Sequence, residues 1–121
     1  MPRMARSVLV VDDSAPFRAT ARALLEARGY RVVGAVAGGG EALAAVEAMR
    51  PDAVLLDINL PDADGIALAG RLSGAGGPAV VLVSTLDGAA LRGAIERSGG
   101  RGFVPKDDLT SPQLVELLGP P

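Results

Sequence analysis

Six polar side chains stand at or just past the ends of short apolar runs in this sequence, and their types suit phosphoryl chemistry. They are Asp12, Asp13, Asp57, Ser84, Thr85 and Lys106. Two carboxylates about 4 Å apart repel each other by about 4 kcal/mol at an effective dielectric of about 20. Converging carboxylates with a single lysine therefore keep an excess negative charge that either protons or a cation must neutralise. An all-oxygen set of ligands suits Mg²⁺, for which Mn²⁺ could substitute. An aspartate beside such a cation, a lysine and a hydroxyl can form an acyl phosphate and hold its oxygens.

The amino-acid composition excludes several classes of catalytic and metal-binding site. The 121 residues include no cysteine and no histidine, which excludes disulfides, thiolate nucleophiles, imidazole catalysis and zinc bound by either residue type. Fourteen acidic and twelve basic residues give a net charge of −2 without a long run of either sign, so we expect no direct binding of nucleic acid. The apolar run at 8–11 is too short for a signal peptide or a membrane helix, and we expect a cytoplasmic protein without membrane contact.

The elements that must position these side chains alternate along the whole chain. The predicted strands are 7–11, 31–35, 53–56, 79–83 and 102–104, and the predicted helices are 15–28, 41–49, 66–72, 89–97 and one that begins at 112. Strict alternation predicts right-handed crossovers and a three-layer α/β fold, with helices on both faces of a five-stranded parallel sheet. In such a sheet the six polar side chains meet at the carboxyl edge.

Turn and capping residues mark the element boundaries. Ser14 or Asp13 is expected to cap the first helix, Asp87 the fourth and Ser111 the last. The glycines at 38–40 are expected to form a turn before a helix that begins at Glu41. We expect a single domain over residues 1–121, in which 1–6 form a flexible terminus and 119–121 a tail or the start of a linker.

Four stretches in order resemble the receiver domains of two-component response regulators, and the resemblance covers essentially the whole chain. The stretches are 8–14 (VLVVDDS), 55–65 (LLDINLPDADG), 81–85 (VLVST) and 102–106 (GFVPK). The resemblance implies a flavodoxin-like (βα)5 fold with strand order 2-1-3-4-5. Because Asp107 follows Lys106 where many receivers have proline, the region is similar to receivers attached to helix-turn-helix output domains of the NarL type, and a cis peptide near Lys106 stays an open question.

The resemblance also implies a role for each site residue. Asp57 would be the phosphoacceptor, and the metal ligands would be Asp12 (mainly through water), Asp13, Asp57 and the backbone carbonyl of Asn59. The phosphoryl group would be bound by Lys106, which first pairs with Asp57, and by Ser84 and Thr85. Ser84 and Phe103 would form the switch, Ser84 moving towards the phosphoryl group while Phe103 turns inward. Thr85 is larger than the alanine or glycine common at this position, and we expect it to slow hydrolysis of the acyl phosphate.

The function implied is a phosphorylation switch that catalyses only its own phosphorylation and dephosphorylation. Its phosphoryl donor would be a sensor histidine kinase or a phosphotransfer protein, and its target a downstream output domain or effector protein; a homodimer is a further partner that the family allows. Three other functions stay as alternatives. A phosphatase of the haloacid dehalogenase type would want an aspartate where Asn59 stands, and nucleotide binding through 34–40 lacks the usual glycine motifs. An interaction module that no longer uses phosphate is the third.

Overall fold

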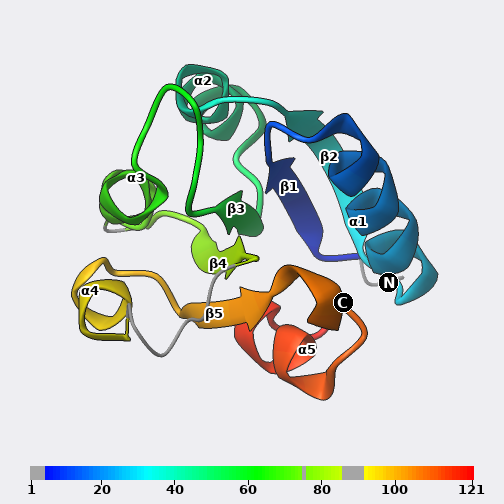
Figure 1. Cartoon of the computed structure of the whole chain (residues 1–121). Helices are drawn as coiled ribbons and strands as arrows, with labels where there is room; N and C mark the ends of the chain where they lie inside the picture. Colours follow the sequence, from blue (N-terminus) through cyan, green and yellow to red (C-terminus); the bar gives the residue numbers. More distant parts are fainter. Residues whose placement is uncertain (1–4, 75, 86–91) are drawn as a thin grey trace.

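The computed structural model describes residues 5–74, 76–85 and 92–121, and it contains one parallel sheet of five strands (Figure 1). The strands are β1 (Ser7–Val11), β2 (Arg31–Val36), β3 (Ala53–Asp57), β4 (Ala79–Ser84) and β5 (Gly102–Pro105). The helices are α1 (Ala15–Ala27), α2 (Gly39–Met49), α3 (Gly65–Leu72), α4 (Arg92–Arg97) and α5 (Pro112–Leu118), with a short 3₁₀ turn, η2, at Lys106–Asp108. The strand order is β2-β1-β3-β4-β5, which confirms the fold predicted from the sequence.

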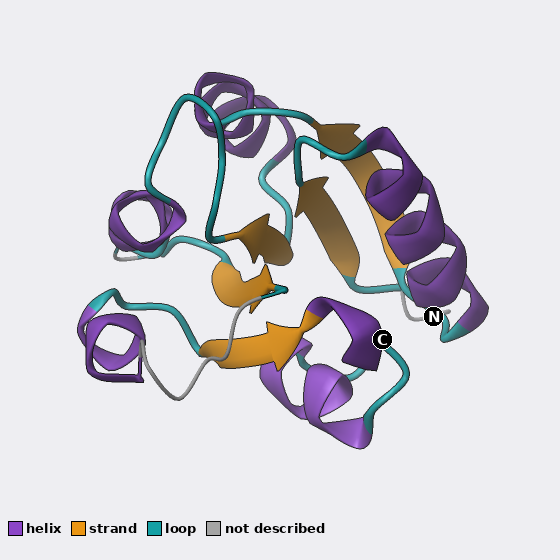
Figure 2. Cartoon of the chain, in the orientation of Figure 1, coloured by secondary structure: helices purple, strands orange, loops and turns teal. Residues whose placement is uncertain are grey.

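Helices cover both faces of the sheet. One core cluster joins alternate β1 residues such as Val8 and Val10 to Leu25 of α1 and Leu114 of α5. The other cluster joins the opposite side chains of the strands to α2, α3 and α4. Figure 2 shows the strands as one curved layer between these two groups of helices. Every residue of β1, β3 and β4 is buried, as expected for central parallel strands covered on both faces.

Four of the strands extend one residue further toward their carboxyl ends than the sequence pattern predicted. Asp57 is the last residue of β3 and pairs with Val83, and Ser84 is the last residue of β4 and pairs with Pro105. Pro105 is compatible with this position because β5 is an edge strand, where a missing amide hydrogen breaks no interior ladder. The sheet itself therefore holds Asp57 and Ser84, which were expected to follow it.

The predicted helix boundaries are correct in part. Ser14 caps α1 by accepting a hydrogen bond from Phe17 N at 3.2 Å. The prediction that the second helix begins at Glu41 is wrong, because α2 begins at Gly39. Ser111 occupies the N-cap position of α5, but its hydroxyl makes no capping hydrogen bond. The expected cap at Asp87 and the expected helix start at residue 89 lie outside the described residues.

Side chains from the first part of the chain hold α5 in place. Arg28 donates to the carbonyls of Leu109 and Ser111 at 2.7 and 3.1 Å, on the side where α5 begins. At the other end of α5, Tyr30 Oη donates to Gly119 O at 2.6 Å. These contacts satisfy carbonyls at both ends of the helix and fix α5 against α1 and β2.

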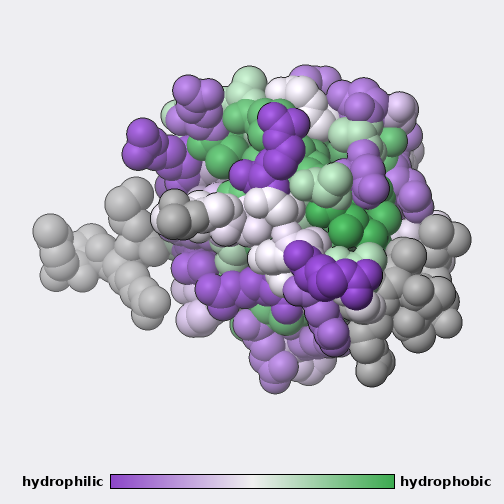
Figure 3. All heavy atoms as spheres, turned by 90° about the vertical axis from the view of Figure 1, so that its left-hand side faces the viewer, coloured by the Kyte–Doolittle hydropathy of each residue, from purple (hydrophilic) through white to green (hydrophobic). Residues whose placement is uncertain are grey.

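The surface is mixed in character. Met49 is the one large hydrophobic side chain that is exposed among the described residues, at 48%. On the face seen in Figure 3, hydrophilic side chains are interspersed with smaller hydrophobic areas. No helix within the described ranges is long and apolar enough to cross a membrane. The peptide bonds around Lys106 are trans, as are those of the other described residues, which answers the question that the sequence left open.

Candidate functional site

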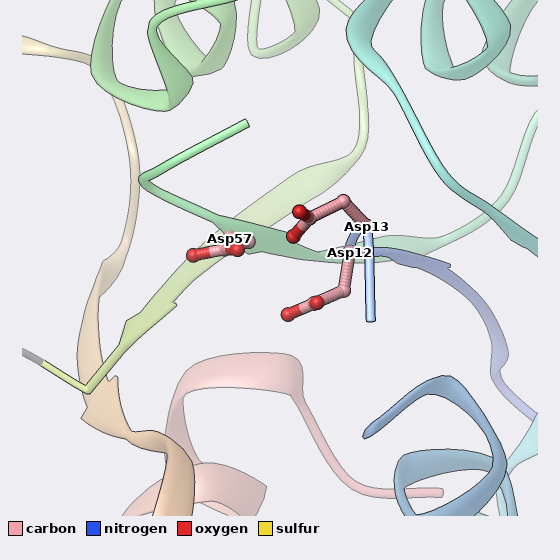
Figure 4. A group of neighbouring side chains, drawn as sticks. All are labelled: Asp12, Asp13 and Asp57. Atoms are coloured by element: carbon pink, nitrogen blue, oxygen red, sulfur yellow. The ribbon is translucent and has the colours of Figure 1, made fainter. Parts of the chain in front are cut away.

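Three carboxylates meet at the carboxyl edge of the sheet (Figure 4). Asp12 and Asp13 follow β1 directly, and Asp57 ends the neighbouring strand β3. One oxygen from each of the three carboxylates lies within 4.8 Å of the others. Asp12 and Asp57 are buried, whereas Asp13 is exposed, so the group opens to solvent on one side. The structure thus brings together the carboxylates that the sequence predicted would converge.

Asp12 is fixed on several sides. Its Oδ1 accepts a hydrogen bond from Ser14 N at 2.8 Å, and its backbone carbonyl accepts one from Arg18 Nη1 at 2.7 Å. Its amide donates to Val36 O of β2 at 3.0 Å. Its Oδ2 is buried and makes no directed hydrogen bond, although it forms an ion pair with Lys106 at 2.6 Å. Such a buried carboxylate oxygen still has a free lone pair, with which it can bind a further positively charged partner.

Lys106 lies between two carboxylates. Its Nζ is 2.6 Å from Asp12 Oδ2 and 3.3 Å from Asp57 Oδ2, so the expected pairing with Asp57 is present and a shorter one with Asp12 accompanies it. The same ammonium lies 4.7 Å from the centre of the Phe17 ring, within cation–π range. Burial disfavours the charge of Lys106, but the two carboxylates outweigh it and raise the pKa of Lys106 above its ordinary value. The lysine is therefore a fixed cation in this site.

Asp57 is buried but well supplied with hydrogen bonds. Its Oδ1 accepts from Asn59 N at 3.1 Å, and its Oδ2 accepts from Lys106. Burial raises the pKa of Asp57, and the negative charge of Asp12 raises it further, while the Asn59 amide and Lys106 lower it without cancelling the rise. A cation placed beside this carboxylate would favour its ionised form.

The loop after β3 turns back sharply on itself. Asn59 pairs with Asp64 in an isolated antiparallel bridge, and Gly65 N donates to Ile58 O at 2.9 Å. A Cβ on Gly65 would lie 2.3 Å from the carbonyl oxygen of Asp57, so no other residue fits there without a backbone shift. This closed loop fixes the backbone of Asn59 next to Asp57.

Of the hydroxyl and aromatic candidates, Ser84 and Thr85 lie beside Lys106, whereas Phe103 packs against the core. Ser84 is fully buried, and Asn59 Nδ2 donates to its Oγ at 3.5 Å. Thr85 is exposed and lines a pocket with Phe17, Ser84, Pro105, Lys106 and Asp107. Phe103 is half-buried and packs against the core cluster on the side of α2, α3 and α4. The pocket places Thr85 and Ser84 beside Lys106, whereas Phe103 is not among the residues that line it.

The donor set fits a hard cation. Every candidate ligand is an oxygen atom, and three carboxylates face a single ammonium group. Mg²⁺ is bound in proteins by one or two carboxylates together with waters, so the exposed side at Asp13 suits it. The residues present therefore fit the metal expected from the sequence.

The comparison with known protein families identifies the chain. Residues 8–118 match the response regulator receiver domain. The chain belongs to this family, and it is a receiver domain of two-component signalling. The family, the fold and the general function predicted from the sequence are thereby confirmed, and a receiver domain fits a phosphoacceptor switch.

The curated relatives are longer than this chain. It is 37% identical over 105 residues to a protein-glutamate methylesterase/protein-glutamine glutaminase of Rhodospirillum rubrum, covering 85% of this chain and 28% of that protein. It is 36% identical over 107 residues to the virulence factors putative positive transcription regulator BvgA of Bordetella pertussis, covering 87% of this chain and 51% of that protein. The chain thus spans between about a quarter and a half of these relatives.

Solved structures of receiver domains superpose on nearly the whole chain. The signal receiver domain of the putative response regulator NarL from Mycobacterium tuberculosis has a TM-score of 0.85 at 29% identity, covering 97% of this chain and 99% of that chain. The response regulator domain of Thermotoga maritima CheB has a TM-score of 0.80 at 28% identity, covering 93% and 92%. The likeness to the NarL receiver agrees with the resemblance seen around Lys106.

Several residues with contacts in or beside the site were not singled out as functional from the sequence. Phe17 was given no functional role, yet its ring lies 4.7 Å from Lys106 Nζ. Arg18 and Asp62 make side-chain hydrogen bonds to backbone groups beside the site. Their roles depend on side-chain directions and on contacts between distant segments, which the spacing of residue types does not reveal.

Proposed function

We propose that this receiver domain accepts a phosphoryl group on the carboxylate of Asp57 from a phosphohistidine of a partner protein, in the presence of Mg²⁺. The observation that carries the proposal is the convergence of Asp12, Asp13 and Asp57 on Lys106. In the transfer, the phosphorus–nitrogen bond of the donor breaks and a phosphorus–oxygen bond to Asp57 forms. The histidine nitrogen keeps the electron pair of the broken bond.

The metal would be held by the carboxylates of Asp13 and Asp57 and by the backbone carbonyl of Asn59, with Asp12 acting mainly through water. Mn²⁺ could take its place because its ligand preference is similar. When bound, the cation supplies positive charge that offsets the charges of the phosphoryl oxygens and of the carboxylates.

The protein's own groups would bind the remaining oxygens. Lys106 already reaches Asp57, so a small movement brings its ammonium to a phosphoryl oxygen attached to that residue. Ser84 would donate a hydrogen bond to the phosphoryl group, and Thr85 would narrow the access of water from the pocket that it lines. Positioning and charge neutralisation of this kind are the main requirements of phosphoryl transfer.

The output would be a change in the partner-binding surface around α4, β5 and α5. Ser84 would move towards the phosphoryl group and allow Phe103 to turn inward from its half-buried position. The partners would be a sensor histidine kinase or phosphotransfer protein as donor and an output domain or effector as target, with a homodimer as a further state. The chain has no histidine of its own, so the donor must come from outside it. We place this activity in the cytoplasm, without direct contact to nucleic acid or membrane.

The test is incubation with acetyl phosphate and MgCl₂ followed by intact-mass measurement. Wild type should gain one phosphoryl group, and Asp57→Ala should gain none. Asp52→Asn is the matched control, because Asp52 is an exposed aspartate that precedes β3, at the opposite end of that strand from Asp57. A gain that persists in Asp57→Ala, or no gain in wild type with Mg²⁺ bound, would contradict the proposal.

A further inference from the structure

The tip of the loop between β3 and α3 is attached to the start of α2 by Asp62. Asp62 Oδ1 accepts a hydrogen bond from Gly39 N at 2.9 Å, and Oδ2 accepts one from Gly40 N at 3.3 Å. Gly38, the N-cap residue of α2, has no side chain that could serve this purpose. The group that satisfies the first amides of α2 therefore comes from a residue 23 positions away in the sequence.

Two of the three consecutive glycines make this approach sterically feasible. A Cβ on Gly39 would lie 2.7 Å from the Cβ of Ala63, and a Cβ on Gly38 would lie 3.1 Å from both carboxylate oxygens of Asp62. A Cβ on Gly40 would meet nothing within 4 Å. The close approach of the loop therefore explains why glycine stands at positions 38 and 39. It does not explain the glycine at position 40.

The other end of the same loop carries the expected metal ligand. Asn59 N donates to Asp57 Oδ1, and Asn59 pairs with Asp64 across the base of the loop. The base is thus closed by backbone contacts, while Asp62 fixes the tip. In Figure 1 the loop leaves β3, runs up beside the start of α2 and returns to α3.

The start of α2 is in turn connected to the other side of the acidic group. Val36, the last residue of β2, accepts a hydrogen bond from Asp12 N at 3.0 Å, and only residues 37 and 38 separate it from α2. A continuous set of contacts therefore runs from Asp12 through the start of α2 and Asp62 to Asn59. Asp62 completes a ring around the carboxylates although it touches none of them.

We propose that Asp62 is a positioning residue for the cation site, which holds the Asn59 carbonyl in place by fastening the loop tip to α2. This inference rests on the proposed function, because it concerns the same Mg²⁺. The amides of Gly39 and Gly40 hold the pKa of Asp62 below its ordinary value, so the carboxylate that makes the attachment stays ionised.

The test compares Mg²⁺ binding with stability in two pairs of variants. Titration of MgCl₂ by calorimetry at fixed ionic strength gives the Kd, and denaturant unfolding in EDTA gives the stability. Asp62→Ala should raise the Kd several-fold, less than the roughly 10–100-fold seen when a group bonded directly to a metal ligand is removed. Asp62→Asn, which keeps an oxygen for the Gly39 amide, should recover part of the loss.

The glycine variants separate positioning from charge. Gly39→Ala leaves the net charge unchanged but displaces the loop, and it should weaken Mg²⁺ binding as Asp62→Ala does. Gly40→Ala is the matched control and should bind Mg²⁺ like wild type. In metal-free protein, the Gly39 and Gly40 amides should exchange hydrogen faster in Asp62→Ala.

Three results would overturn the inference. A wild-type Kd in Asp62→Ala with reduced stability would make Asp62 a helix cap and no more. A raised Kd in Asp62→Ala together with a wild-type Kd in Gly39→Ala would assign the effect to lost charge. Absence of Mg²⁺ binding in wild type would overturn the proposed function itself, which distinguishes the two failures.

Discussion

Lys106 lies closer to Asp12 than to Asp57, at 2.6 Å from the first carboxylate and 3.3 Å from the second. The carboxylate of Asp12 is fully buried, and an unpaired buried charge is costly, so the short ion pair compensates for its burial. The lysine expected to bind a phosphoryl group therefore also has a structural task in the metal-free protein. Competition between these two carboxylates for one ammonium has measurable consequences.

Lys106→Met should destabilise the metal-free protein. Removal of the ammonium leaves Asp12 and Asp57 as adjacent buried carboxylates, and because Lys106 is partly exposed we expect a loss of about 1–3 kcal/mol, below the range for fully buried pairs. Mg²⁺ should restore more stability to this variant than to wild type, since it supplies the missing positive charge. Urea unfolding in EDTA and in MgCl₂ measures both effects.

Lys106→Arg keeps the charge and is the control for that experiment. It should lose less stability than Lys106→Met. A Lys106→Met protein that is as stable as wild type in EDTA would show that the ion pair with Asp12 contributes nothing.

Asp57 should make the stability of the metal-free protein depend on pH. Because burial raises its folded-state pKa above the ordinary value of 3.8, its favourable contribution is fully present below that value and is lost as pH rises through the folded pKa. Asp57→Asn avoids this loss. The variant should therefore be more stable than wild type at neutral pH in EDTA, and the difference should shrink as the solution is acidified.

Thermal unfolding of both proteins across acidic to neutral pH checks this expectation. Added Mg²⁺ should stabilise wild type more than Asp57→Asn, because the cation favours the ionised carboxylate. A stability difference that grows on acidification would show that the pKa of Asp57 is lowered instead.

Gly65→Ala should disturb the loop that carries Asn59. Its Cβ would lie 2.3 Å from Asp57 O and 2.6 Å from Ile58 Cα, and both are backbone atoms that cannot rotate away. We expect a loss of about 3 kcal/mol, in the upper part of the range for overpacked sites, together with weaker Mg²⁺ binding. Gly74→Ala is the control, since a Cβ there would meet nothing within 4 Å. Equal stability of the two variants would contradict the expectation.

The sequence predicted the convergence at the site because it follows from topology. Parallel strands place their carboxyl ends at one edge, so Asp12, Asp57 and Ser84 had to approach one another once the alternation of strands and helices was recognised. The residue types then limited the chemistry to oxygen ligands and a lysine. No side-chain direction was needed for this inference.

Other features of the fold and of the site could not be predicted, because they depend on contacts between segments that are distant in the sequence. The start of α2 at Gly39 depends on an acceptor from Asp62, and a local pattern of three glycines gives no sign of it. Lys106 pairs with Asp12 as well as with Asp57, and its distances to the two carboxylates, 2.6 and 3.3 Å, differ by less than 1 Å. Such contacts are set by packing, which residue spacing does not determine.

Thr85→Ala should shorten the lifetime of the phosphorylated form. Thr85 is exposed and lines the pocket beside Ser84 and Lys106. If Asp57 is phosphorylated as proposed, the side chain of Thr85 would hinder water that approaches through this pocket. Replacement by alanine should speed hydrolysis by up to about tenfold, which corresponds to about 1.4 kcal/mol of activation free energy. The lifetime is measured by intact mass at intervals after removal of acetyl phosphate. Thr110→Ala, at an exposed threonine outside that pocket, should leave it unchanged, and an unchanged lifetime in Thr85→Ala would refute the role of Thr85.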